Sequence, residues 1–413
     1  MEISIIVIGD ELLLGQVTDT NSGDIARAFA PAGWTVRDVL SVHDDADAIT
    51  AAISRALEQT PVVITTGGLG PTKDDITKAT LCRVFGGGMH FDDRVMANVE
   101  EIFRRRGLQM NELTRRQAMV PDSCRVIPNE VGTAPIMWFE KDGRVLVSMP
   151  GVPFETRHAL RLVVPELLGR FGERTVVRHR HFTVTDVSES ALAERLAQWE
   201  EALPAWMHLA YLPNAGYHRL RIDAVGEDAA SVERELDERS EVLVALLGAN
   251  LLGQGDKTPA EMLMEQLQRL HLTMATAESC TGGNIAHRMT MIPGVSEVLR
   301  GGVVAYDNDV KHRVLGVSEE TLAAFGAVSE PVASQMAEGA RRALGADVAV
   351  STSGIAGPGG GSEAKPVGTV CMAVSTPRGT EAVTVHLPGD RARVIDRATT
   401  TAIIRLIRTL QRF

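Results

Sequence analysis

Short apolar runs that end in glycine-rich loops recur along this chain, and they constrain its fold more than any other feature of the sequence. In the first part of the chain these runs are ISIIVI at 3–8, PVVITT at 61–66 and RVLVS at 144–148. Continuous apolar runs of this length are typical of buried strands in a parallel sheet. A segment with helical apolar spacing, 21–32, lies between the first two. The alternation predicts a doubly wound α/β domain over residues 1–170.

The middle of the chain has a different pattern. Residues 175–185 and 218–225 alternate like antiparallel strands, whereas 188–200 and 228–247 have helical spacing. Together they predict a small α+β module over 171–250.

From Thr258-Pro259, which carries helix-start signals, the α/β pattern returns and predicts a second α/β domain over 258–413. Its expected helices are 259–270, 283–291, 330–344 and 391–411, and its expected strands are 272–277, 301–306, 347–352 and 368–375. The expected fold is therefore two distinct α/β domains joined by a small α+β module.

Composition excludes several classes of function. The 413 residues carry a formal net charge of −11, which repels nucleic acid, and the most basic segment, RTVVRHR at 174–180, reads as a half-exposed strand. No apolar run approaches the roughly 18 to 20 residues that cross a bilayer, and the start of the chain lacks a basic secretory n-region. Four cysteines without a CxxC pair fit a reducing compartment. We therefore expect a cytoplasmic protein with no membrane or nucleic-acid partner.

A candidate nucleophile follows the strand expected at 272–277. The segment ESCTGG at 278–283 leads directly into a helical pattern. Such a turn places a hydroxyl beside free backbone N–H groups, which can hold an oxyanion or a phosphate. Ser279 is thus a candidate nucleophile, and Gly282 and Gly283 permit close approach of a ligand. The alternative is that Ser279 or Thr281 only caps the helix.

A serine nucleophile needs a base, and the sequence offers no histidine in a triad-like arrangement near it. Lys311 with a lowered pKa, or Tyr306 coupled to it, is the available substitute. The alternative is an exposed lysine and a packed tyrosine, which the residues alone favour. Cys280 is a second possible nucleophile, but its side chain should point away from that of Ser279 in an extended segment, so we expect it to pack.

Three loops at expected strand ends in the first domain offer groups that suit a nucleotide. They are GDELL at 9–13 with DTNS at 19–22, GGLGPTKDDIT at 67–77, and MPGVPFE at 149–155. Glycine loops can cradle a pyrophosphate, Asp74 and Asp75 can hold a divalent cation, and Lys73 can offset phosphate charge. The alternative is that the paired aspartates are solvated. The candidate ligand contacts are Glu11, Asn21, Gly67, Gly68, Gly70, Lys73, Gly151 and Glu155.

Residues 258–413 resemble the C-terminal domain of the CinA family and the related stand-alone nicotinamide-nucleotide amidases. The resemblance is carried by AESCTGG at 277–283, VVAYDNDVK at 303–311, GAVSEPV at 326–332 and SGIAGPGGGSEAKPVGTV at 353–370. It implies that Ser279, Tyr306 and Lys311 deamidate nicotinamide mononucleotide without a cofactor. The substrate contacts that it implies are Thr281, Gly282, Gly283, Gly354, Ile355, Gly357 and Arg391.

The first domain resembles the molybdopterin-binding fold of MogA and MoeA type proteins, and more closely the N-terminal half of CinA. Asp75, followed by Ile76-Thr77, matches the aspartate of the Asp-Val-Thr motif of that fold. The CinA resemblance implies a metal-dependent ADP-ribose pyrophosphatase, whereas the fold alone implies pterin binding. The middle region is similar to the KH-like module of CinA, but it has no GXXG loop, so we expect no RNA binding there.

We therefore expect a bifunctional homodimeric hydrolase that acts on two small-molecule nucleotides, nicotinamide mononucleotide and ADP-ribose. Two alternatives stay open. The N-terminal domain binds molybdopterin or a nucleotide without turnover, or the protein is a competence-related factor, against which its acidic charge argues.

Overall fold

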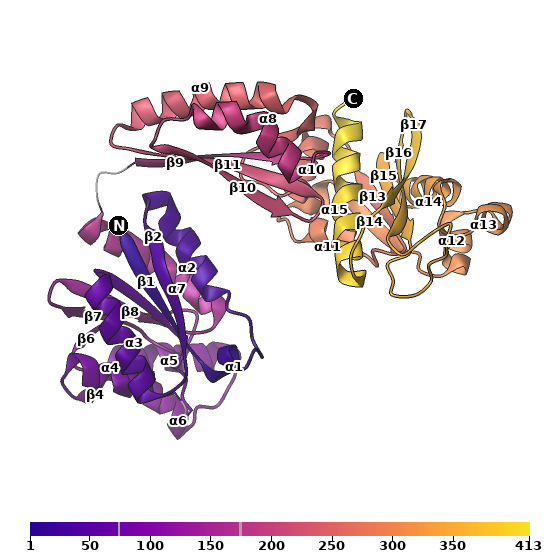
Figure 1. Cartoon of the computed structure of the whole chain (residues 1–413). Helices are drawn as coiled ribbons and strands as arrows, with labels where there is room; N and C mark the ends of the chain where they lie inside the picture. The colour runs from indigo at the N-terminus through magenta and orange to yellow at the C-terminus, as the bar shows by residue number, and fades with distance from the viewer. Residues whose placement is uncertain (73–74, 173–175) are drawn as a thin grey trace. The chain divides into compact units, whose positions relative to one another are not determined.

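The computed structural model describes residues 1–72, 75–172 and 176–413 (Figure 1). The chain forms two compact units, one with Met1–Arg178 and Val225–Val232, the other with His179–Ala224 and Glu233–Phe413. The predicted α/β class is confirmed, because helices alternate with strands in both units. The three domain boundaries stay predictions. No described helix combines the length and apolarity needed to cross a bilayer.

The first unit contains a six-stranded sheet whose side chains pack against a layer of helices on each face. In spatial order its strands are β2 (Thr35–Val42), β1 (Glu2–Ile8), β3 (Val62–Thr66), β8 (Arg144–Met149), β7 (Ile136–Lys141) and β6 (Cys124–Ile127). The first four are parallel, as the apolar runs predict, and β7 and β6 are antiparallel to their neighbours. Ile5 of β1 packs with α2 (Asn21–Phe29) and α7 (Pro153–Phe171), while Ile6 packs with α3 (Ala46–Gln59) and α4 (Thr77–Phe85).

Further elements of the first unit connect the strands and helices described above. They are α1 (Asp10–Leu13), η1 (Ala30–Ala32), β4 (Met89–Phe91), α5 (Asp93–Arg106), α6 (Glu112–Arg115), η2 (Arg116–Ala118) and β5 (Met119–Pro121). Strands β4 and β5 pair as an antiparallel two-stranded sheet. Along the chain, α5, α6 and η2 lie between these two strands, and β6 follows β5.

The middle region forms a four-stranded sheet, and its predicted α+β pattern is confirmed. The strand order is β10 (Met207–Asn214), β11 (Tyr217–Gly226), β9 (Val176–Val184) and β12 (Leu251–Gln254). Figure 1 shows α8 (Glu189–Glu201) and α9 (Ala229–Leu247) along one face, and η3 (Gly248–Asn250) precedes β12. The likeness to a KH module stays a prediction.

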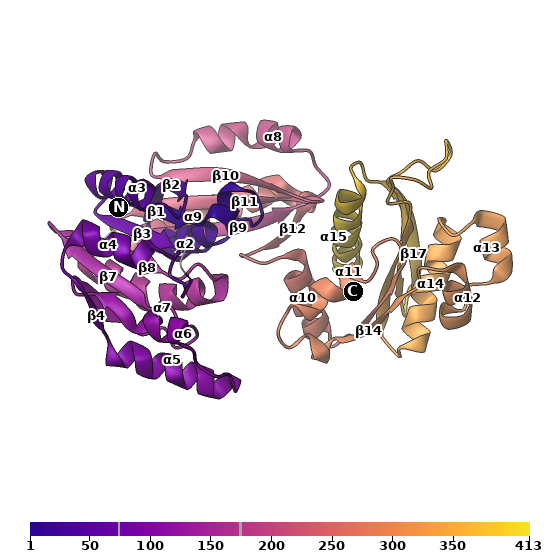
Figure 2. The same cartoon turned by 90° about the horizontal axis from the view of Figure 1, so that it is seen from below.

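The C-terminal region contains a five-stranded sheet in which three parallel strands continue into an antiparallel pair. Its strand order is β14 (Leu299–Val304), β13 (Met274–Glu278), β15 (Val348–Gly354), β16 (Thr369–Thr376) and β17 (Gly379–His386). Figure 2 shows α15 (Arg391–Leu410) on one side of this sheet and α14 (Glu330–Ala343) on the other. The remaining helices are α10 (Pro259–Leu270), α11 (Asn284–Thr290), η4 (Val295–Glu297), α12 (Asn308–Leu315) and α13 (Glu319–Phe325).

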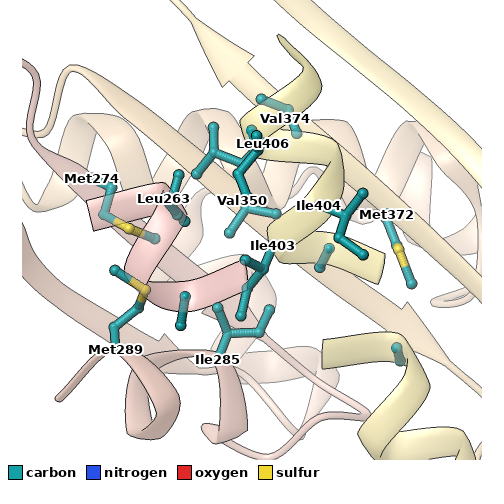
Figure 3. Packing of buried hydrophobic residues seen from close by; sticks show 14 of the residues in the cluster. Leu263, Met274, Ile285, Met289, Val350, Met372, Val374, Ile403, Ile404 and Leu406 are labelled. Carbon is teal, nitrogen blue, oxygen red and sulfur yellow. The ribbon is translucent and has the colours of Figure 1, made fainter. Parts of the chain in front are cut away.

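The layer between the sheet and helices α10, α11 and α15 is a continuous apolar core (Figure 3). Leu263 of α10 and Leu406 of α15 meet Val350 of β15, and all three are 0% exposed. Burying each side chain of this size contributes about 1.5–3 kcal/mol, so this layer anchors the sheet whose edge carries the candidate amidase residues.

On the opposite face, α14 lies against the end of α12 through Gly339. A Cβ at Gly339 would lie 1.9 Å from the backbone oxygen of Leu315. We predict that Gly339→Ala destabilises the protein by about 1–3 kcal/mol in urea unfolding, because the two helices must separate. The matched control is Gly169→Ala in α7, where a Cβ meets nothing within 4 Å. It should stabilise by about 0.5–1 kcal/mol through helix propensity. Equal effects of the two substitutions would contradict the close packing of α12 on α14.

Candidate functional site

The carboxyl ends of three parallel strands meet at one edge of the C-terminal sheet. Glu278 of β13 lies opposite Val304 of β14 and Thr352 of β15. Ser279 therefore leaves the sheet between the loops that follow β14 and β15. The chain passes from β13 to β14 on one side and then to β15 on the other. The strand order thus reverses at β13, which is where open α/β sheets bind ligands.

A cavity of about 290 Å³ lies at this edge. The predicted amidase residues that line it are Ser279, Tyr306, Lys311, Gly354, Ile355, Gly357 and Arg391. The structure does not bring Thr281, Gly282 and Gly283 into this lining. The turn at Ser279, the Tyr306–Lys311 segment and a second glycine-rich loop, residues 353–362, therefore meet at this cavity, while the role of each residue stays a prediction.

The turn after β13 is organised by the carboxylate of Glu278, a residue that the sequence analysis missed. Glu278 is 0% exposed and accepts the backbone N–H groups of Ile285 and Ala286 at 2.9 Å each. It also accepts the Thr281 hydroxyl at 2.8 Å, and that hydroxyl lies 2.7 Å from the Thr352 hydroxyl. The amides at the start of α11, which we expected to hold a ligand, are thus bonded to the chain itself. A glutamate at the end of a buried strand, directly before a helix, was the signal for this arrangement.

Ser279 and Cys280 belong to opposite faces of the sheet. Ala275 and Ala277 of β13 pack in the cluster on the α14 side, and Ser279 continues that alternation. Cys280 packs in the cluster on the α15 side, although it also borders the cavity. Burial raises the pKa of the Cys280 thiol to about 12, which keeps it protonated and a poor nucleophile. The expected packing of Cys280 agrees with this placement.

Of the two charged residues that line this cavity, Lys311 and Arg391, Lys311 is buried, with 1% of its surface exposed. Its Nζ donates to the backbone oxygens of Ala305 at 2.9 Å and Tyr306 at 3.1 Å. Burial lowers the pKa of the amine, and the nearby carboxylate of Asp307 only partly opposes this shift. The alternative of an exposed lysine is therefore wrong. Its burial depends on residues distant in sequence, and for that reason the local pattern NDVK did not reveal it.

Tyr306 lies at the mouth of the cavity and is 61% exposed, so the alternative of a packed tyrosine is wrong as well. Its hydroxyl accepts from Nη2 of Arg391 at 2.9 Å, while Nη1 of the same guanidinium donates to the backbone oxygen of Gly357 at 2.9 Å. Arg391 therefore bridges the loops after β14 and β15, and it brings a permanent positive charge to the cavity.

Two residues that the sequence analysis did not single out hold the segment before α14 at the cavity. The buried hydroxyl of Ser353 donates to the backbone oxygen of Ala327 at 2.6 Å. Lys365 donates from Nζ to the backbone oxygens of Phe325 at 2.9 Å and Val328 at 2.7 Å. These bonds tie the segment before α14 to the second glycine-rich loop and fix the shape of the cavity.

A larger cavity, of about 560 Å³, lies at the carboxyl ends of β1, β3 and β8 in the first unit. It is lined by every predicted residue of this site that the structure describes, namely Glu11, Asn21, Gly67, Gly68, Gly70, Asp75, Gly151 and Glu155. The predicted Lys73 and Asp74 lie outside the described residues. The three predicted loops thus meet at one cavity.

Two glycines allow the loop after β3 to lie close to its neighbours, Gly67 against β1 and Gly68 against α4. Gly67 has φ +106° and a Cβ there would lie 2.0 Å from the backbone oxygen of Ile8. Gly68 has φ +64° and its Cβ would lie 2.1 Å from the Thr77 hydroxyl. Only glycine fits both conditions, the positive φ and the close approach. Asn21 secures the same region, because its Nδ2 donates to the backbone oxygen of Gly151 at 2.8 Å.

Asp75 shapes the glycine-rich loop as well as lining the cavity. Its carboxylate accepts the backbone N–H of Gly70 at 2.7 Å and both the N–H and the hydroxyl of Thr72, at 2.9 and 2.5 Å. The alternative of a merely solvated aspartate is therefore not what the structure shows. A metal ligand at this position would be pre-oriented by these three donors.

Asp44, which the sequence analysis missed, adds a further carboxylate to this cavity. Burial raises its pKa, and the nearby carboxylates of Asp10, Glu11 and Asp75 raise it further. A divalent cation would relieve this repulsion. Within the described ranges, no three His, Cys, Asp or Glu side chains are arranged to hold a metal ion. The residues fit a cation of the Mg²⁺ type, held by one or two carboxylates and completed by phosphate oxygens of a ligand.

Glu155, in the first turn of α7, supplies a buried carboxylate to the same cavity. It is 9% exposed and accepts from Nδ2 of Asn129 at 2.7 Å, and burial raises its pKa. Gly132 lies so close that a Cβ there would be 1.8 Å from the carboxylate. The carboxylate is thus enclosed by its surroundings and fixed in orientation.

Comparison with known proteins gives two family matches and many relatives of full length. The CinA C-terminal domain matches residues 256–410, and a probable molybdopterin binding domain matches residues 4–169. A CinA-like protein of Gemmatimonas aurantiaca is 43% identical over 416 residues, covering 100% of this chain and 97% of that protein. A putative competence-damage inducible protein of Desulforudis audaxviator is 41% identical over 410 residues, covering 99% and 98%.

Solved structures match parts of the chain. The competence/damage inducible protein CihA from Agrobacterium tumefaciens is 42% identical, with a TM-score of 0.36, over 37% of this chain and 93% of that one. A molybdopterin biosynthesis protein from Mycobacterium abscessus is 17% identical, with a TM-score of 0.29, over 40% of this chain and 92% of that one.

Proposed function

Because the chain belongs to the CinA family, we propose that it is a bifunctional hydrolase of two nucleotides. Its C-terminal domain is proposed to convert nicotinamide mononucleotide to nicotinate mononucleotide and ammonia without a cofactor. Its N-terminal domain is proposed to hydrolyse ADP-ribose with a divalent cation. The four free thiols of Cys82, Cys124, Cys280 and Cys371 support action in a reducing compartment, which we take to be the cytoplasm, and we propose a homodimer.

The observation that carries the amidase proposal is the buried amine of Lys311 in the same cavity as the Ser279 hydroxyl. A serine is a weak nucleophile at its ordinary pKa and needs a group that takes its proton. An exposed lysine is protonated at neutral pH and cannot do so. Because burial lowers the pKa of Lys311, a larger fraction of this amine is neutral and able to act as a base.

The proposed reaction passes through an ester. The Ser279 oxygen attacks the carboxamide carbon while Lys311 takes the hydroxyl proton. When the C–N bond breaks, Lys311 returns that proton to the nitrogen, and ammonia leaves. Water then attacks the ester carbon, Lys311 takes a proton from it, and the proton goes to the Ser279 oxygen as the acid is released. Tyr306, whose backbone oxygen binds the Lys311 amine, lies beside this proton path.

The phosphate of the substrate is assigned to Arg391 and the second glycine-rich loop. Gly357, Gly359 and Gly360 line the cavity beside the Arg391 guanidinium. A guanidinium binds phosphate through two parallel N–H groups, and glycine lets backbone amides approach the same group. This assignment replaces the helix start at Gly282 and Gly283, whose following amides are bonded to Glu278.

We predict that Ser279→Ala and Lys311→Met each lower kcat for nicotinamide mononucleotide by about 10² to 10⁴-fold with little change in KM, because both groups act in the transition state. The wild-type kcat should rise with pH through the lowered pKa of Lys311 and level off above it, since the neutral amine is the base. Ammonia release measured across a pH series checks both statements.

Cys280→Ser is the matched control for this experiment, because it changes the neighbouring nucleophile and keeps the size of the side chain. It should retain deamidation near the wild-type rate. An inactive Cys280→Ser variant beside a fully active Ser279→Ala variant would assign the attack to the thiol and overturn the mechanism.

The pyrophosphatase proposal is supported by the carboxylates and glycine backbone of the 560 Å³ cavity. A bound divalent cation supplies Lewis-acid polarisation of a phosphoryl oxygen and offsets the charge of the diphosphate. In this chain Asp75 and Asp44 are the described residues proposed to hold it. The glycine-rich loop positions the diphosphate, and Glu155 is the buried carboxylate that would meet a proton-bearing group of the ligand.

We predict that ADP-ribose hydrolysis stops when divalent cations are chelated, and that Asp75→Asn lowers it at least about 100-fold while deamidation is unchanged. Asp47→Asn, on the exposed first turn of α3, is the control and should keep both activities. Release of AMP and ribose 5-phosphate measures the reaction. Hydrolysis that continues in chelator would contradict the proposal, and tight binding of ADP-ribose without hydrolysis would favour the alternative of a binding module.

A further inference from the structure

Gln117, whose side chain lines the 560 Å³ cavity, is bonded to the buried amine of Lys78, and the proposed reactions use neither group. Lys78, in the first turn of α4, is 8% exposed, and Gln117, in η2, is 2% exposed. Nζ of Lys78 donates to the backbone oxygen of Gln117 at 2.8 Å and to its side-chain Oε1 at 3.1 Å. Both bonds link elements that are 39 residues apart in the chain.

The contact with Lys78 fixes which way the Gln117 amide is turned. A lysine ammonium only donates hydrogen bonds, so the amide atom that faces it is the oxygen. The amide nitrogen Nε2 is therefore directed away from Lys78. This Nε2 is buried, and no described residue accepts a hydrogen bond from it, although Gln117 itself lines the cavity.

A buried donor without a partner is costly, by roughly 1–3 kcal/mol, and such groups are rare in folded proteins. At the wall of a cavity, the natural partner is an acceptor atom of the ligand. The Gln117 amide nitrogen donates hydrogen bonds, whereas the carboxylates of Glu11, Asp44 and Glu155, which line the same cavity, accept them.

The buried amine also strengthens the amide as a donor. Burial lowers the pKa of Lys78 to about 8, and the carboxylate of Asp75 opposes this shift. A positive charge on the oxygen side of an amide polarises its N–H groups, and in a site of low dielectric this makes them better donors. The atom that suits such a donor is an oxygen with full or partial negative charge.

We propose that Nε2 of Gln117 donates a hydrogen bond to an oxygen of the ADP-ribose diphosphate or of its terminal sugar, and that Lys78 is the positioning residue that holds the amide in this orientation. The choice of ADP-ribose rests on the proposed pyrophosphatase function. The donor itself rests on the geometry of Lys78 and Gln117 alone.

The test is calorimetric binding to the full chain with Mg²⁺ present. The probes are ADP, ribose 5-phosphate and an ADP-ribose analogue with a methylene group in place of the bridging oxygen, which is not hydrolysed. Gln117→Glu keeps an oxygen for Lys78 but removes the donor, so Kd for the analogue should rise about 10-fold to 100-fold. A parallel loss for ADP assigns the acceptor to the diphosphate, and a parallel loss for ribose 5-phosphate assigns it to the sugar.

A double-mutant cycle separates positioning by Lys78 from a merely structural role. Lys78→Met should raise Kd for the analogue in the wild-type background and have little further effect once Gln117→Met is present. A structural role for Lys78 would produce the same loss in both backgrounds and would overturn its assignment as a positioning residue.

Thr60→Val is the control, because Thr60 is a buried hydrogen-bonding residue of the same unit that precedes β3, at the end of the sheet away from the cavity. It should leave every Kd unchanged, and thermal unfolding of each variant reports whether the fold is kept. Wild-type affinity of both Gln117 variants for all three probes overturns the inference, as does a wild-type protein that binds none of them. If the analogue binds and Gln117→Glu weakens it, but ADP-ribose is not hydrolysed, the pyrophosphatase proposal fails and the inference stands.

Discussion

Burial of the Lys311 amine against two backbone carbonyl oxygens is the interaction on which the chemistry of the C-terminal cavity depends. Asp307 caps α12 directly after β14, so that Lys311 lies one turn into the helix and its amine returns to the oxygens of Ala305 and Tyr306. The close packing of α14 on the end of α12 at Gly339 keeps this helix against the sheet. Burial removes the amine from water, which disfavours its charged form, and the pKa of the amine therefore falls. The same lysine in water would be a cation with no capacity to accept a proton from Ser279.

The two candidate sites occupy the same position in their sheets but have opposite electrostatics. Both lie at the carboxyl ends of parallel strands, where loops can be varied without disturbing the core. The C-terminal cavity carries the permanently charged guanidinium of Arg391, which suits an anionic phosphate directly. The N-terminal cavity carries carboxylates at Glu11, Asp44, Asp75 and Glu155, which repel a diphosphate unless a cation lies between them. This difference gives a physical reason why one proposed activity needs a metal and the other does not.

Much of the fold could be predicted from the sequence, because β1, β3 and β8 are buried on both faces and so appear as short, mainly apolar runs. Strands such as β2 and β17 were not predicted, since their mixed exposure leaves a weaker pattern. The loops that form both cavities could be found as well, because strand ends and glycines mark them. Side chains whose burial or bonding depends on residues outside the local pattern could not be found from the sequence. Lys311 is buried by the assembled structure, and Glu278 accepts a hydrogen bond from the amide of Ile285 near the start of α11. Lys78 of α4 donates to Gln117 of η2, which is a different element. Identical residues in a local pattern are usually exposed, so only the assembled structure reveals their burial.

The identity of the nucleophile can be measured directly by mass spectrometry of protein that is mixed with nicotinamide mononucleotide and quenched in acid within the first turnover. The proposed chemistry predicts an ester of the nicotinate mononucleotide acyl group on the peptide that contains Ser279, formed as ammonia is released. Lys311→Met should slow the appearance of both. An adduct on Cys280 instead, or normal turnover in a protein whose Ser279 is replaced by alanine, would contradict the assignment of Ser279 as the nucleophile that Lys311 activates.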